Sequence, residues 1–425
     1  MTITATAIRS PLIASVADEV AAGRAGAEDA FWARVTLDGA PLMEEVEDDP
    51  RSTLLTFVWR DDGNTDNVLV LFFSAPTDGD FSEFRMERLA GTGIWYRTYL
   101  VPSELRTTYL LSVNDDMTPF SSYAEVLERL PTYRPDPLNT AAYTLMGNPN
   151  EFTVSVLELP GAPRQPWNIP RRGVPRGEVT METLDSDRTG SRHHVMVYRP
   201  SGYSDAGEPH PLLVLFDGWS YYNFAAVTTV LDNLVYTGRI PPYVIVMHTN
   251  EDQEVRAREL PCDDAFQDFL VSELLPWVED RYNVTDDPSR TVVAGSCFGG
   301  LAAVYAAFRA PHRFGNVISQ SGSFWWPGAG VPGVPDRWLI QKFRDSATLP
   351  IRFSLEIGAL EQAIIEYDPM ASHREMRDVL LEKGYEVDYS EYMGGHDMVC
   401  WRGTLVDRLL SFHPRDAAAV NRGDR

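Results

Sequence analysis

The sequence Arg290-Thr-Val-Val-Ala-Gly-Ser-Cys-Phe-Gly-Gly300 decides the fold of this chain. An apolar run leads into Gly295-Ser-Cys-Phe-Gly299, and a helix-forming stretch follows. A strand, a tight turn with two spaced glycines and a helix are typical of a nucleophile elbow, where the glycines make room for a strained central residue. The usual pattern, G-x-S-x-G, has serine at its centre. Here the central residue is Cys297.

Ser296, one position earlier, is the alternative nucleophile. With Ser296 at the centre, Phe298 would stand where the turn needs glycine or another small residue, and Gly295 and Gly299 would have no role. A free cysteine is otherwise most often a small buried hydrophobic residue. The strand–turn–helix context favours Cys297 as the residue at the nucleophile position.

Length and composition indicate a globular chain with more than one domain. The chain has 425 residues, enough for two or three domains, and a hydrophobic content of 44%, which is ordinary for proteins with packed cores. The net charge of -24 excludes a general nucleic-acid or anionic-membrane surface, because both need clustered Lys and Arg. No stretch is long and apolar enough to span a bilayer, so we expect neither a nucleic-acid nor a membrane partner.

The N-terminus and the cysteines indicate the cellular location. The N-terminal stretch lacks a charged region followed by an uninterrupted apolar run, so it does not look like a signal peptide. The cysteines are Cys262, Cys297 and Cys400, an odd number, and no pair has metal-ligand spacing. We therefore expect a reduced, cytoplasmic protein without a resident metal.

The N-terminal part predicts an antiparallel β-sandwich. One helix is expected from about residue 15 to 28. Short β-rich segments separated by acidic or Gly-containing turns follow, at 54–60, 67–73, 95–100 and 107–113. Prolines in 133–139 and 160–170 predict a linker, because proline resists helix interiors and sheet ladders. The expected first domain is residues 1–160.

From about residue 171 strands alternate with helices. Expected strands are 193–199, 211–216, 243–247, 291–294, 316–319, 351–357 and 386–389, and expected helices include 263–281, 300–308, 372–383 and 401–411. This alternation predicts a mostly parallel sheet covered on both faces. With the elbow, it predicts an α/β-hydrolase domain at residues 171–415, and ligands should bind beyond the carboxyl ends of its strands.

The general base should lie near the C-terminus, because hydrolases of this fold carry nucleophile, acid and histidine in that order. His396, in Gly394-Gly-His-Asp397, follows a predicted strand and lies in a glycine-rich loop that leads into a helix. His373 lies in a helical stretch and His413 lies beyond the last predicted helix, so both are weaker candidates. We take His396 as the base.

The acid should follow the strand predicted at 351–357. Glu361 lies just past its end and is the choice, and Glu356 and Asp368 are rivals that the sequence does not eliminate. An oxyanion hole needs backbone N–H groups from the residue after the nucleophile and from a loop after an early strand. The corresponding residues are Phe298 and the pair Gly218 and Trp219.

These segments together resemble the enterochelin esterase family, cytoplasmic hydrolases that cut the trilactone of ferric catecholate siderophores. The resemblance covers nearly the whole chain. Its segments are 57–60, 86–95, 136–139, 215–218, 258–261, 273–277, 321–326 and 394–402. It implies His396 as base, and Arg256, Arg258 and Arg402 as candidates for holding an anionic catecholate complex, with Trp325 as a further substrate-binding candidate.

Cys297 departs from this family, whose pattern has serine at the nucleophile position. A thiol is more acidic and more nucleophilic than an alcohol, so Cys297 with His396 could attack an ester and form a thioester. The leading hypothesis is a hydrolase that cleaves ester (lactone) bonds of a catecholate-siderophore-like substrate through a Cys297 acyl-enzyme.

Two alternatives stay open. One is an acyltransferase or chain-releasing enzyme that passes an acyl group from Cys297 to an amine or alcohol. The other is a non-catalytic siderophore-binding protein. None of the three functions requires a metal or an organic cofactor, because iron would arrive with the substrate.

Overall fold

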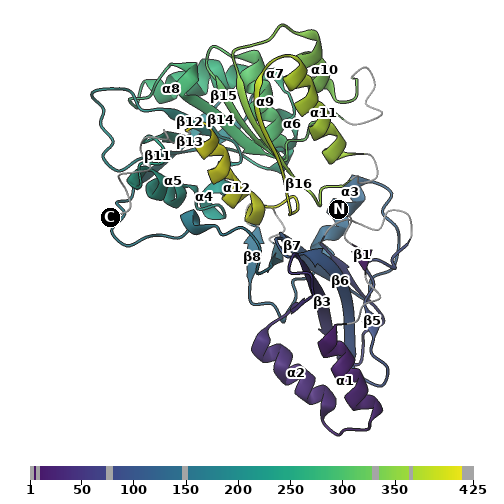
Figure 1. Cartoon of the computed structure of the whole chain (residues 1–425). Helices are drawn as coiled ribbons and strands as arrows, with labels where there is room; N and C mark the ends of the chain where they lie inside the picture. Colours follow the sequence, from purple (N-terminus) through teal and green to yellow (C-terminus); the bar gives the residue numbers. More distant parts are fainter. Residues whose placement is uncertain are drawn as a thin grey trace. The chain divides into compact units, whose positions relative to one another are not determined.

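A computed structural model describes residues 4–5, 10–72, 80–145, 152–327, 335–362 and 367–413. The chain forms two compact units that are interleaved along the sequence (Figure 1). The first unit comprises Met1–Pro163, Ala359–Glu366 and Met393–Asp397, and the second comprises Arg164–Gly358, Tyr367–Tyr392 and Met398–Arg425. Two short C-terminal segments thus group with the N-terminal part.

The first unit is a sandwich of two antiparallel sheets. Its elements are β1 (Thr4–Ala5), α1 (Pro11–Ala21), α2 (Ala27–Asp38), β2 (Leu42–Glu45), β3 (Ser52–Arg60), β4 (Val68–Leu71), β5 (Glu87–Arg88), β6 (Ile94–Pro102), β7 (Arg106–Val113), α3 (Tyr123–Arg129), β8 (Ala142–Leu145) and β9 (Phe152–Glu158). One sheet has the order β1-β6-β3-β2, with β5 paired to β6, and the other has the order β4-β7-β9-β8. Phe57 of β3 and Tyr109 of β7 are buried with ring centroids 4.8 Å apart, so the sheets pack face to face as predicted.

Two expectations for this unit were wrong. The single helix expected at 15–28 is two helices, because Gly23 and Gly26 adopt positive φ and break it after α1. The proline-rich stretch 133–139 does not leave the domain. Its Asp136 is buried and accepts a 2.8 Å hydrogen bond from the Tyr109 hydroxyl, and β8 and β9 follow it. The expected strand 67–73 is β4, and Phe73 lies outside the described residues.

The second unit is an α/β domain built on an eight-stranded sheet. Its strands are β10 (Glu178–Asp185), β11 (Arg192–Arg199), β12 (Leu212–Leu215), β13 (Val244–Asn250), β14 (Thr291–Ser296), β15 (Asn316–Gln320), β16 (Arg352–Gly358) and β17 (Glu386–Tyr392). Their order is β10-β11-β13-β12-β14-β15-β16-β17. All neighbours from β13 to β17 pair in parallel, whereas β10, β11 and β13 pair antiparallel. The mostly parallel sheet is confirmed, and β10 was missed because its sequence is largely polar and exposed.

Helices cover both faces of this sheet (Figure 1). They are α4 (Gly218–Asn223), α5 (Val227–Tyr236), α6 (Gln253–Glu259), α7 (Asp264–Phe269), α8 (Leu275–Glu279), α9 (Phe298–Arg309), α10 (Trp338–Asp345), α11 (Pro369–Glu382) and α12 (Met398–Ser411). One buried cluster includes residues of α7 to α11, and another includes residues of α4, α5 and α12. None of the helices in the described ranges is long and apolar enough to cross a membrane.

Candidate active site

Cys297 is the single residue between β14 and α9. Its backbone has φ 56° and ψ −124°. A non-glycine residue pays for positive φ, so the conformation is strained, as the elbow of a hydrolase requires. The sequence prediction of a strand–turn–helix centred on Cys297 agrees with this local geometry.

The two glycines of the motif are explained by lack of space. A Cβ on Gly295 would lie 2.5 Å from the backbone of Gly299, closer than real Cβ contacts. A Cβ on Gly299 would lie 3.0 Å from Asp217 Oδ2. The strand before the turn and the helix after it therefore pass too close together for any side chain at Gly295.

The last residue of β15 and the loop that follows it hold the backbone of Cys297. The Cys297 N–H donates to the Gln320 carbonyl at 3.0 Å, and the Cys297 carbonyl accepts from the Ser323 N–H at 3.1 Å. The Cys297 Sγ lies 3.7 Å from the Ser323 Oγ. The sulfur thus has a polar neighbour, although a thiol is a weak hydrogen-bonding group.

Arg256 places a positive charge next to the thiol. Its guanidinium donates to Asp217 in a bidentate pair, at 2.6 Å from Nε to Oδ1 and 2.7 Å from Nη2 to Oδ2. Burial works to lower the pKa of Arg256, but Asp217 and the charge and hydrogen bond of Cys297 outweigh it, so the pKa lies above its ordinary value. An opposite charge beside a thiol favours the thiolate. Arg256 was predicted as a substrate-binding residue, and that role stays a prediction; in the structure its guanidinium is paired with Asp217.

The oxyanion candidates lie at two helix starts. Phe298 is the first residue of α9 and Gly218 is the first residue of α4. A Cβ on Gly218 would lie 2.6 Å from the backbone of Met247, so glycine is required there. The Trp219 N–H donates to the Thr249 Oγ1 at 2.9 Å, so the expectation that it contributes to an oxyanion hole is revised.

His396 and Glu361 lie together in the first unit. The distance from His396 Nδ1 to Glu361 Oε2 is 2.6 Å, and a carboxylate can only accept, so Nδ1 carries the proton. The Glu361 side chain is 4% exposed and that of His396 is 42% exposed. A buried carboxylate therefore orients an imidazole that solvent and ligands can reach.

The rival acids and histidines have other partners. Asp368 caps α11 by accepting from the Ala371 N–H at 2.9 Å. The His373 Nε2 lies 2.7 Å from the Gly322 carbonyl, and the His413 Nε2 lies 2.8 Å from the Tyr243 hydroxyl. The structure thus selects Glu361, among the acids that the sequence left open, as the partner of His396.

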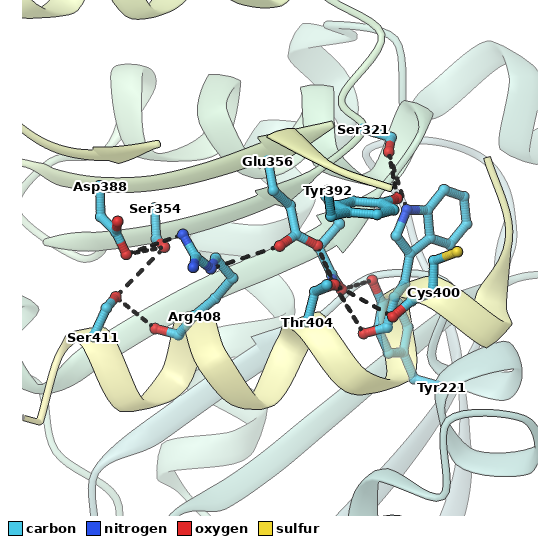
Figure 2. A network of polar contacts seen from close by, with 12 residues as sticks. Tyr221, Ser321, Ser354, Glu356, Asp388, Tyr392, Cys400, Thr404, Arg408 and Ser411 are labelled. Carbon is cyan, nitrogen blue, oxygen red and sulfur yellow. Dashed lines mark hydrogen bonds and ion pairs between the residues drawn. The ribbon is translucent and has the colours of Figure 1, made fainter. Parts of the chain in front are cut away.

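Glu356, the remaining rival, is buried in a polar network of the second unit (Figure 2). Its Oε1 accepts from the Gln320 Nε2 at 2.6 Å and from the Thr404 Oγ1, and its Oε2 lies 3.6 Å from the Arg408 Nε. Burial raises the pKa of Glu356 to about 7, although Arg408 works to lower it.

This network lies directly behind the nucleophile. Ser296, Gln320 and Glu356 are register partners across β14, β15 and β16. The Gln320 Oε1 accepts from the Tyr221 hydroxyl of α4 at 2.7 Å. Sequence reasoning missed this row of polar residues, although Gln320 and Glu356 stand within strands that were predicted to be buried, where Gln and Glu are uncommon, and this was a usable signal.

The other substrate-binding candidates, Arg258, Arg402 and Trp325, each contact different residues. The Arg258 Nη2 donates to the Ser191 Oγ at 2.6 Å, and the side chain is 52% exposed. The Arg402 Nε donates to the Gln165 Oε1 at 2.6 Å. Trp325 stacks on Tyr367 with ring centroids 3.9 Å apart, and its centroid is 6.0 Å from that of Phe298, beside the nucleophile.

The described part of the chain offers no metal centre of its own. No group of three or more His, Cys, Asp or Glu side chains within it could hold a metal ion. Cys262, Cys297 and Cys400 carry no disulfide.

Comparison with protein families gives two matches. Residues 186–412 match the family described as "Putative esterase", and residues 54–168 match the family "Enterochelin esterase, N-terminal". The first match contains the elbow, His396 and Glu361. The second contains most of the β-sandwich.

Individual relatives match over most of both chains. The iron(III) enterobactin esterase of Dickeya dadantii is 31% identical over 89% of this chain and 92% of its own length. The crystal structure of the ferric enterobactin esterase of Salmonella typhimurium is similar with a TM-score of 0.75 and 30% identity, over 90% of this chain and 98% of that one. That of the Shigella flexneri enterobactin esterase, determined in the presence of enterobactin, has a TM-score of 0.72 and 30% identity, over 92% and 98%.

Proposed function

The chain belongs to the enterochelin esterase family, and from this premise we propose that it cleaves the ester bonds of a catecholate siderophore trilactone through a thioester on Cys297. The observation that carries the proposal is the strained backbone of Cys297 with the charge of Arg256 beside its thiol. The chain order Cys297, Glu361, His396 supports it, because hydrolases of this fold follow that order.

In the first step the Cys297 sulfur attacks an ester carbonyl and the His396 Nε2 takes the thiol proton. Glu361 accepts from the other imidazole nitrogen, at 2.6 Å, and stabilises the imidazolium. The N–H groups of Phe298 and Gly218 would stabilise the oxygen of the tetrahedral intermediate. The C–O bond then breaks, and the leaving alkoxide takes the proton from His396.

In the second step water attacks the thioester. His396 accepts a proton from that water, the carbon–sulfur bond breaks, and the proton returns to the Cys297 sulfur. The products are a linear fragment with a free acid and the restored thiol. No redox partner or resident cofactor enters this balance.

A substrate of this class would be anionic, and basic and aromatic side chains suit it. We assign Arg258 and Arg402 to its charge and Trp325 to a catechol ring, since arginine pairs with planar oxygen groups and an indole stacks on aromatic rings. Such a substrate would be met in the cytoplasm, and three cysteines without a disulfide are consistent with a reduced compartment.

The test is the intact mass of the protein after brief incubation with a catecholate trilactone, ferric and iron-free, with products separated by chromatography. We expect linear fragments and a transient acyl adduct that is absent in Cys297→Ala. Cys297→Ser should retain hydrolysis, and Cys262→Ala, which removes another partly buried thiol, should behave as the wild type.

Other outcomes would replace the proposal. An adduct that persists until an amine is added, and then yields an amide, would establish acyl transfer. Tight binding without adduct or product, unchanged in Cys297→Ala, would establish a binding protein.

A further inference from the structure

The loop that carries His396 is tied to strand β7 of the sandwich by its backbone. The Arg106 N–H donates to the Met393 carbonyl at 3.2 Å, and Arg106 and Gly394 form a parallel bridge. The Leu360 N–H, one residue before Glu361, donates to the Gly394 carbonyl at 3.0 Å. The loop that carries His396 is therefore hydrogen-bonded both to β7 and to the loop that carries Glu361.

Asp397, the residue after His396, ties the same loop to β7 by its side chain. Its Oδ2 accepts from the Thr107 Oγ1 and the Thr108 N–H, each at 3.1 Å, and from the Thr108 Oγ1 at 3.4 Å. Asp397 is 8% exposed. Hydrogen bonds to a buried carboxylate are stronger than neutral ones, and losing their partner is costly.

Tight packing also holds the His396 loop against β7. A Cβ on Gly395 would lie 2.7 Å from the Thr107 Oγ1, so only glycine fits between His396 and β7. Leu360 is buried in the core of the sandwich, and Met393 packs against that core. Two adjacent glycines would otherwise leave this loop with great conformational freedom.

We infer that Asp397, Thr107 and Thr108 are positioning residues for the His396–Glu361 pair, so that the β-sandwich serves catalysis by holding the base and acid. The inference rests on the proposed function for its catalytic consequence, but the anchor itself does not. A general base must be held within a fraction of an ångström, because a displacement of about 1 Å can cost about 100-fold in rate.

The test compares Asp397→Asn with wild type in steady-state hydrolysis of an iron-free catecholate trilactone and in hydrogen exchange of peptides covering 104–110 and 393–397. Asparagine keeps the shape of the side chain. It presents either an NH₂ group or an uncharged oxygen to the three donors of Thr107 and Thr108, so their hydrogen bonds are lost or weakened. We expect kcat to fall roughly tenfold to a hundredfold with KM nearly unchanged, and exchange of both peptides to rise.

Two threonine variants sharpen the result. Thr107→Val should lower kcat and Thr107→Ser should restore it, because serine keeps the hydroxyl. Thr56→Val is the matched control, since it removes a buried 2.9 Å hydroxyl contact with Thr98 elsewhere in the same unit. It should leave kcat unchanged even if it lowers stability.

Each result decides the inference. Unchanged exchange in Asp397→Asn would overturn the anchor. Faster exchange with wild-type kcat, or an equal kcat loss in Thr56→Val, would overturn the positioning role. Wild-type protein that turns over no ester would refute the proposed function and with it the catalytic consequence, while exchange would still report on the anchor.

Discussion

The nucleophile and the base–acid pair are held in place by different means. Cys297 is fixed by its immediate neighbours, between a strand and a helix that approach so closely that glycine is required at position 295. His396 and Glu361 are fixed by residues far away in the sequence, such as Thr107, which is 290 positions from Asp397. The nucleophile should therefore be sensitive to added atoms, and the base–acid pair to the loss of single hydrogen bonds.

The largest effect is expected from Glu361→Gln, which removes the charge that stabilises the His396 imidazolium. We expect kcat/KM to fall about 10³- to 10⁴-fold, as when the acid of a catalytic triad is neutralised. Steady-state hydrolysis of a catecholate trilactone measures it. Glu356→Gln is the control, and an equal loss there would show that the base–acid pair has been assigned to the wrong glutamate.

The next effect concerns stability and the network behind the nucleophile. Burial raises the pKa of Glu356 from 4.5 to about 7, so the folded protein holds this proton more tightly and loses stability as the pH rises through that interval. Glu356→Gln has no such proton. Its free energy of unfolding should rise relative to wild type by about 3 kcal/mol between about pH 5 and about pH 8.

Urea denaturation of both proteins across this range gives the difference. A difference that stays constant with pH would contradict the titration of Glu356. A difference in the free energy of unfolding that does not change with pH reports only the changed contacts with Arg408 and Thr404.

Gly295→Ala tests the close approach in the elbow. The added methyl would meet the Gly299 backbone at 2.5 Å, so strand and helix must move apart. We expect a loss of about 1–3 kcal/mol in the free energy of unfolding, with reduced esterase activity. Gly93→Ala is the control, because its methyl meets the flexible Glu28 side chain at 3.1 Å, and equal losses would refute the special tightness of the elbow.

Arg256→Gln tests the charge beside the thiol. Without the guanidinium the thiolate loses a stabilising neighbour, so the midpoint of Cys297 alkylation by iodoacetamide should move to higher pH. Arg256→Lys keeps a positive charge and should shift it less. Equal alkylation midpoints in wild type, Arg256→Gln and Arg256→Lys would show that Arg256 does not activate Cys297.

The smallest effect is expected from Arg258→Ala. The side chain is half exposed, so we expect KM for the ferric trilactone to rise about threefold to tenfold with kcat unchanged. Arg290→Ala, which removes another partly exposed arginine, should leave KM unchanged. A fall in kcat instead would place Arg258 among the groups that act in the transition state.

The same comparison explains what could be predicted from the sequence. The elbow was predictable because its strand, glycines and helix lie within eleven consecutive residues, and apolar runs marked the parallel strands. Glu361 could not be separated from Glu356 and Asp368 by spacing, because the contact with His396 is spatial. The roles of Asp217, Gln320 and Asp397 depend on partners in distant segments, and no local pattern reports such partners.

The anchoring of the His396 loop on β7 limits how the gene can recombine with genes for related chains. The first unit is not a contiguous stretch of the chain, because 359–366 and 393–397 return to it. Recombination at the boundary after Pro163 would exchange Thr107 and Thr108 but leave His396, Glu361 and Asp397 behind. We expect such chimaeras between divergent relatives to lose activity, so the two parts of the gene should change together and be inherited as one module.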